Sequence, residues 1–200
     1  MKSLNPYLFI LFLTLSISCS TISTSKTKAQ VPPVRKVAVL NFDMNNANWG
    51  AEFSDSFVHR LLKYSRWEII EREQIFKILN EQKLSRSGVI DTETSTKIGR
   101  ILGVDAIIVG RGTALNYVSV DKQPINYLVD TFSMKVVLVE SGSILLQSRK
   151  SPGTDWTPFR IAKYLLGLSL IWSKEDIFIE SCAYDSVADR MSQLIAENVK

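Results

Sequence analysis

Arg66-Trp67-Glu68-Ile69-Ile70-Glu71-Arg72 is followed directly by residues 73–84, and these two segments together decide the fold. Trp67, Ile69 and Ile70 suit a pleated, half-buried surface, so residues 66–71 predict a short strand. The apolar period then changes to that of a helix, at Ile75, Ile78, Leu79 and Gln82. A strand that runs straight into a helix is half of a βαβ unit.

The segments upstream supply the other half of this unit. Residues 37–42 are a continuous run that predicts a buried strand. Residues 49–64 then predict a helix whose apolar face carries Phe53, Phe57, Leu61 and Tyr64. Strand, helix and strand therefore follow one another, and the crossover between the strands is expected to be right-handed.

The segments downstream extend the sheet and then reverse its direction. Residues 91–94 offer several N-caps for a helix with an apolar stripe at Ile98, Ile101 and Leu102 and with Gly103 at its C-cap, and a strand over 104–110 follows. Residues 131–140 and 144–148 predict two strands joined by a turn at Ser141-Gly142, which makes an antiparallel hairpin. Apolar residues at helical spacing from 183 to 195 predict a last helix, with Asp185 and Asp189 on its solvent side.

These elements predict an α/β fold in a single domain over residues 35–200. Parallel βαβ units and an antiparallel hairpin form one mixed sheet, with helices packed on it in a three-layer-like arrangement. The composition, 46% hydrophobic and 22% charged, is that of an ordinary globular protein. A net charge of +4 is too small to indicate a nucleic-acid partner.

The N-terminus has the layout of a secretory signal. Lys2 precedes an apolar run over 7–15, too short to span a bilayer, and small residues lead to Cys19. This ending resembles a bacterial lipoprotein signal, although Leu15 lies four residues before the cysteine and Ser16 takes its usual place. We therefore expect a signal peptide over 1–18 and a lipid on Cys19; the alternative is ordinary signal cleavage beside a chance cysteine.

Residues 19–34 are expected to be the lipidated cysteine and a flexible tether, because they are rich in Ser and Thr and end near Pro32 and Pro33. The chain has two cysteines, so a lipid on Cys19 leaves no disulfide partner for the other. That other cysteine, Cys182, lies in a helical apolar pattern and is expected to be a small core residue.

The sequence offers little that indicates catalysis. His59 is the only histidine and lies in the middle of a predicted helix, without neighbouring metal-ligand residues. Gly110-Arg111-Gly112 ends a predicted strand but no helix follows, so it lacks the context of a phosphate-binding loop. We expect no enzyme, no cofactor or metal and no small-molecule substrate.

Two features are candidates for binding. Residues 158–172 predict a helix in which Arg160 and Lys163 flank a broad apolar face ending at Trp172. That face either contacts a membrane or partner, or packs on the domain's own sheet. Trp49 and Trp156 lie in polar loops, where an exposed aromatic side chain is typical of an interface.

Four segments in this order resemble the curli-assembly transport family (CsgG-type) of lipidated outer-membrane proteins. They are residues 37–42, 65–72 leading into 78–82, 106–112 and 136–145. The resemblance implies an α/β domain facing the periplasm, an outer membrane location through the lipid anchor, and self-association into rings. It also implies contacts with proteins of a secretion or envelope-assembly complex.

The sequence departs from transporting members, in which each chain gives two long hairpins to a transmembrane barrel. In the first hairpin region, only 115–120 and 125–129 around Pro124 can be strands, and both are shorter than the roughly 9–11 residues that cross a membrane. The second region, 151–176, has helical spacing. We therefore expect an anchored protein that acts by protein–protein interaction without a complete barrel of its own.

Two alternatives remain open from the sequence. The same domain type resembles lipoprotein activators of peptidoglycan synthases (LpoB-type), although the short tether does not favour a protein that must cross the periplasm. An oligomeric export channel would require residues 151–176 to form a membrane hairpin.

Overall fold

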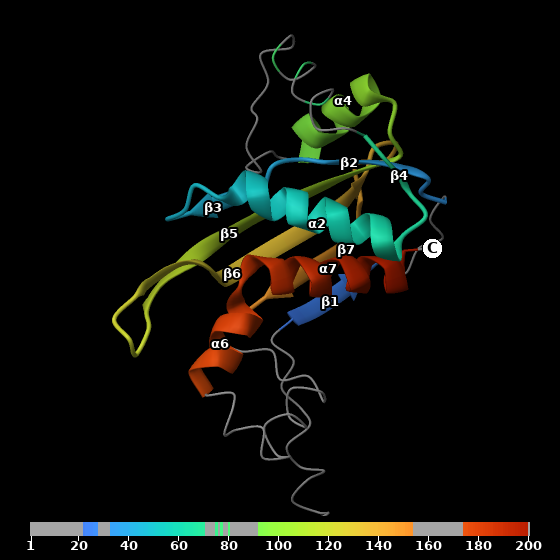
Figure 1. Cartoon of the computed structure of the whole chain (residues 1–200). Coiled ribbons are helices and arrows are strands. Elements are labelled where there is room, and N and C mark those ends of the chain that lie inside the picture. The colour runs from blue at the N-terminus through green and yellow to red at the C-terminus, as the bar shows by residue number, and fades with distance from the viewer. Residues whose placement is uncertain are drawn as a thin grey trace, which may run out of the picture.

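A mixed seven-stranded sheet forms the centre of the molecule in the computed structural model (Figure 1). The structure describes residues 22–27, 33–70, 75, 77, 80, 92–153 and 174–199. The strands are β1 (Ile22–Lys26), β2 (Lys36–Val39), β3 (Asp43–Asn45), β4 (Glu68–Ile69), β5 (Ala106–Val118), β6 (Pro124–Leu138) and β7 (Ile144–Lys150). The helices are α2 (Gly50–Tyr64), α4 (Thr92–Leu102), α6 (Lys174–Cys182) and α7 (Tyr184–Asn198). Strand order is β1-β7-β6-β5-β2-β4, and β3 also pairs with β5.

The parallel half of the sheet confirms the predicted βαβ unit. β2 lies between β4 and β5 and is parallel to both, while α2 connects β2 and β3 to β4. β4 is only two residues long, shorter than the predicted strand over 66–71, although Ile70 still donates its backbone N–H to Val37. α4 ends at Leu102, and the next residue, Gly103, has a φ of 65°, the left-handed conformation expected of a C-cap glycine.

The antiparallel half confirms the predicted hairpin and corrects its length. β6 and β7 pair across a turn in which Gly142 has a φ of 67°. β6 begins at Pro124, earlier than the predicted 131, and β5 continues to Val118 instead of stopping near residue 110. The segments expected to be short separate strands around Pro124 are therefore the ends of two long strands.

Helices cover both faces of the sheet, which confirms the three-layer arrangement. α2 and α7 lie side by side on one face (Figure 1), where Phe53, Phe57 and Met191 are fully buried. α4 packs on the other face over Ile107 and Val109, together with Ile75. Gly110 leaves room for the aromatic rings of the first layer, because an added Cβ would lie 2.4 Å from the Phe132 ring.

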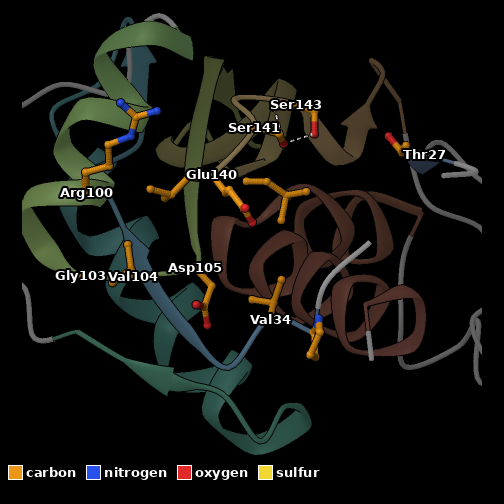
Figure 2. Close-up of a pocket in the computed structure, with 13 residues that line it drawn as sticks. Thr27, Val34, Arg100, Gly103, Val104, Asp105, Glu140, Ser141 and Ser143 are labelled. Atoms are coloured by element: carbon orange, nitrogen blue, oxygen red, sulfur yellow. Dashed lines mark hydrogen bonds between the residues drawn. The ribbon is translucent and has the colours of Figure 1, made fainter. Parts of the chain in front are cut away.

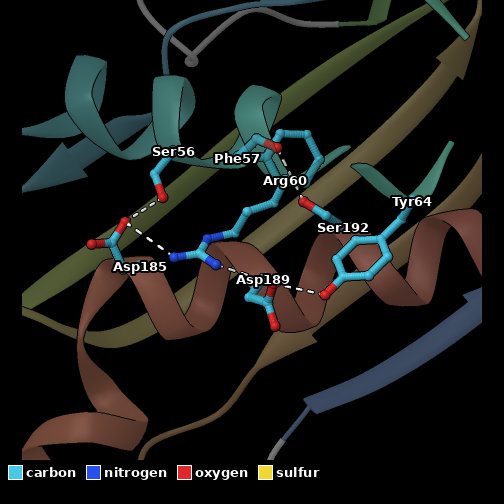
Figure 3. A network of polar contacts seen from close by, with 7 residues as sticks. All are labelled: Ser56, Phe57, Arg60, Tyr64, Asp185, Asp189 and Ser192. Carbon is cyan, nitrogen blue, oxygen red and sulfur yellow. Dashed lines mark hydrogen bonds and ion pairs between the residues drawn. The ribbon is translucent and has the colours of Figure 1, made fainter. Parts of the chain in front are cut away.

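Polar contacts join α2 to α7 beside this core (Figure 3). Arg60 pairs with Asp189 at 3.1 Å and with Asp185 at 3.8 Å, and Ser56 donates to Asp185. Tyr64 also donates its hydroxyl to Asp189, over 3.0 Å. The prediction that these aspartates lie on the solvent side of α7 is confirmed for Asp185, which is exposed, while Asp189 is half-buried, and both also contact polar side chains of α2.

Asp189→Ala is expected to lower the free energy of unfolding by about 1 kcal/mol, because it removes two hydrogen bonds that are partly screened by solvent. Urea denaturation measures the change. Glu197→Ala, at an exposed position of the same helix, is the matched control and should change stability far less. Equal effects of the two substitutions would mean that the contacts between α2 and α7 contribute nothing.

Candidate functional site

A hairpin formed by β5 and β6 projects beyond the rest of the sheet (Figure 1). β3 pairs with β5 only as far as Thr113, and β7 pairs with β6 only from Phe132 onward. The projecting arms, residues 114–118 and 124–129, therefore pair with each other and not with further named strands of the described chain. A turn over 119–123 closes the hairpin.

Apolar side chains are exposed near the tip of this hairpin. Val120 is 80% exposed, Val118 64% and Tyr127 41%. They share this surface with Asp121 and Lys122, which are also exposed. Exposed aliphatic and aromatic groups next to polar ones are typical of surfaces that contact another molecule.

α6 supports the outer part of the hairpin. Glu175 accepts a hydrogen bond from the backbone N–H of Val120 over 2.8 Å. The Tyr117 hydroxyl also bonds to the Glu175 carboxylate, and this bond raises the pKa of Tyr117 above its usual value. The Tyr117 ring lies 5.3 Å from that of Phe178. The hairpin is therefore held against α6 by hydrogen bonds and by an aromatic contact.

Trp49 contacts the β6 arm of the hairpin, which corrects the expectation that it is an exposed contact residue. Its ring is 9% exposed and stacks on Tyr184 at a centroid distance of 5.3 Å. Its indole N–H donates to the backbone carbonyl of Asn126 in β6. Because Trp49 lies in a loop before a helix, its side chain was predicted to be exposed. The hairpin and α7, which are distant in the sequence, cover it instead.

β1 lies within the segment that was expected to be a flexible tether. Residues 22–26 pair antiparallel with β7 at one edge of the sheet, so this part of the segment belongs to the folded domain. Ile22 opposes Lys150, which in turn opposes Phe132, where the hairpin leaves the sheet. The first residue of β1 therefore lies at the hairpin end of the sheet, and the strand runs away from it.

Most of the other predicted site residues are outside the described residues. These are Cys19, Trp156, Arg160, Lys163 and Trp172, together with the predicted signal peptide and the predicted helix over 158–172. His59 is exposed on α2, and Cys182 is 1% exposed in α6, as expected of a core residue. Within the described ranges, no three His, Cys, Asp or Glu side chains are grouped so as to hold a metal ion.

A hollow of about 570 Å³ lies between α4, the turn after β6 and the start of β2 (Figure 2). Arg100, Glu140 and the two hydroxyls of Ser141 and Ser143 line it. Asp105 also lines it, but its carboxylate accepts the backbone N–H groups of Arg35 and Lys36, at 2.8 Å each. Asp105 thus fixes the start of β2. The remaining polar groups carry opposite charges and do not together indicate one class of ligand.

The sequence matches the profile of the family "Curli production assembly/transport component CsgG" over residues 19–122, just over half of its 200 residues. The chain belongs to the CsgG family. The match begins at Cys19 and ends inside the hairpin turn, so the CsgG part includes β1 and all of β5. β6, β7, α6 and α7 follow it in the chain. No curated protein matched the sequence.

Several solved structures are similar to this CsgG-family chain, all at low identity. The LpoB C-terminal domain from Escherichia coli is 16% identical, with a TM-score of 0.43, over 60% of this chain and 84% of that one. The PelC dodecamer from Paraburkholderia phytofirmans is 11% identical, with a TM-score of 0.47, over 90% and 99%. Lipoprotein GNA1162 from Neisseria meningitidis is 12% identical, with a TM-score of 0.42, over 68% and 97%. Likenesses this remote say nothing of what the chain binds.

No helix among the described residues of this CsgG-family chain combines the length and the apolar character needed to cross a membrane.

Proposed function

We propose that this CsgG-family chain is a lipid-anchored envelope protein that acts by protein–protein interaction in secretion or envelope assembly. The observation that carries the proposal is the family match over residues 19–122, which starts at the cysteine of the lipoprotein-like signal. The anchor on Cys19 attaches the chain to the outer membrane, and the folded domain faces the periplasm. The proposed work is binding rather than catalysis.

The direction of β1 supports a specific orientation for the anchored domain. Cys19 is three residues before Ile22, so the chain between them spans at most about 10 Å. Ile22 begins at the end of the sheet from which the hairpin projects. A lipid on Cys19 therefore holds this end, with exposed Val118 and Val120, toward the membrane.

Cys19→Ser is expected to remove the protein from the membrane, because the hydroxyl cannot form the thioether that carries the lipid. The measurement is the distribution of the full-length protein between membrane and soluble fractions, with metabolic labelling by a clickable fatty acid. We expect most of the protein to be labelled and membrane-bound, and the variant to be unlabelled and soluble.

Cys182→Ala is the matched control, since it removes the other cysteine at a buried position far along the chain. It should leave both the label and the membrane location unchanged. A Cys19→Ser protein that stays labelled and membrane-bound would overturn the anchor. Label lost from both variants would show that the fatty acid reports something other than the N-terminal lipid.

A further inference from the structure

The sheet face opposite α2 and α7 changes from apolar to polar along its length. Near α4 it presents buried Ile107 and Val109. Two residues further along β5 the same face presents Arg111, which is exposed, because side chains alternate between the faces of a strand. β6 and β7 contribute polar groups there by the same alternation, since their intervening residues Met134 and Ser148 point to the buried side.

The strand register places the polar side chains of this face in two adjacent rows. Arg111 opposes Ser133, and Ser133 opposes Arg149, so one row has an arginine on each side of a hydroxyl. Two strand spacings put the arginine Cα atoms about 10 Å apart. In the next row, Lys135 opposes Gln147, two residues and about 7 Å along the strands.

The rows border a hollow of about 550 Å³ that includes both arginines, Ser133, Thr131, Gln147 and Asp43. Gln147 donates its side-chain amide to the Ser133 hydroxyl over 3.3 Å, so these two groups are already positioned. Neither arginine has a hydrogen bond or ion pair with any side chain that the structure describes. Asp43 is the only carboxylate among the lining residues, so the face carries an excess of positive charge.

We propose that this face, defined by Arg111, Ser133, Lys135, Gln147 and Arg149, binds an acidic segment of a partner protein. Guanidinium groups bind carboxylates through paired hydrogen bonds. The hydroxyl and amide groups between them suit the backbone of a polypeptide. The inference rests on the proposed function, because it names the chemistry of the partner of this binding module.

The spacing of the cations favours a polypeptide over a single compact anion. Alternate side chains of an extended chain on the same side are about 7 Å apart, close to the separations of 7 to 10 Å among the three cations. A lone phosphate would require the cations to converge on one point, and Asp43, the register partner of Arg111 on β3, opposes a dense polyanion. A segment with acidic residues at alternate positions satisfies all three cations.

The test measures binding of a fluorescent deca-glutamate peptide to the full-length protein in detergent micelles, by anisotropy. Charge reversal in Arg111→Glu/Arg149→Glu is expected to weaken binding by about tenfold or more. Lys63→Glu/Lys122→Glu makes the same change in net charge on α2 and at the hairpin tip, and should weaken binding less than about threefold. Circular dichroism and the melting temperature verify that both variants are folded.

Three results would overturn the proposal. These are equal losses in the two double variants, no binding of the peptide to the parent protein at low salt, and displacement of the peptide by equimolar inorganic phosphate. Failure here is distinguishable from failure of the proposed function, because membrane attachment through Cys19 is scored without the peptide. If the protein is anchored but does not bind the peptide, only the proposal of an acidic partner is overturned and the proposed function remains.

Discussion

Phe53→Ala is expected to lower the free energy of unfolding by about 3–5 kcal/mol, a substantial part of the stability of an ordinary domain. The Phe53 side chain is fully buried. Its ring centroid lies 4.6 Å from that of Phe132 on β6 and 5.0 Å from that of Phe42, which follows β2. It is also 6.1 Å from both Trp49 and Tyr184. One side chain therefore joins the sheet, both helices of its layer and the base of the hairpin.

Two terms make up this loss of stability. The variant no longer gains the free energy of removing the phenyl ring from water on folding, and its folded state contains a cavity where the ring was. Urea denaturation followed by circular dichroism measures the loss. Leu62→Ala is the control, because Leu62 is on the same helix but 57% exposed, and its substitution should cost less than about 1 kcal/mol. Similar losses in the two variants would contradict the central role of the aromatic cluster.

Local periodicity accounts for the elements that were predicted correctly. Phe53, Phe57 and Leu61 recur at helical spacing, and they form the buried face of α2. The turn at Gly142 was predicted from its residue types alone, because a positive φ favours glycine. In both cases the signal lies within a few residues of the element that it specifies.

The wrong predictions depended on partners far away in the chain. β1 has the sequence of a polar linker, and it becomes a strand because β7 supplies its hydrogen bonds. Trp49 is buried by Tyr184 and by Asn126. Spacing along one segment carries no information about such pairings.

The polar sheet face was missed for a related reason. In the sequence Arg111 belongs only to the segment Gly110-Arg111-Gly112, and Arg149 belongs to no motif. They become neighbours across β6 only through the register of three strands. Alternation within each strand was available in the sequence, but the order and register of strands were not.

Lys150, at the end of β7, is a charged residue buried where the hairpin leaves the sheet. It is 1% exposed. Its ammonium donates to the backbone carbonyls of Asp130 at 2.9 Å, and of Ser151 and Gly153 at 3.3 Å each. Asp130 lies at a shift in the pairing of β5 with β6, where Thr131 opposes Thr113 but Val129 opposes Ala114. A bulge of this kind leaves a residue without a ladder partner, and Lys150 binds its carbonyl.

Lys150→Met is therefore expected to lower the free energy of unfolding by about 2–3 kcal/mol, because the apolar stem is kept while the bonds of the buried ammonium to backbone carbonyls are lost. Lys135→Met is the matched control: it removes the same charge from the neighbouring strand β6, at a less buried position on the open sheet face, and should change stability by less than about 1 kcal/mol. Urea denaturation measures both. A gain in stability in Lys150→Met would mean that desolvation of the ammonium outweighs its three bonds, so that the lysine shapes the departure of the hairpin at a net cost. A loss confined to Lys150→Met would establish that the ammonium stabilises the bulge from which the hairpin projects.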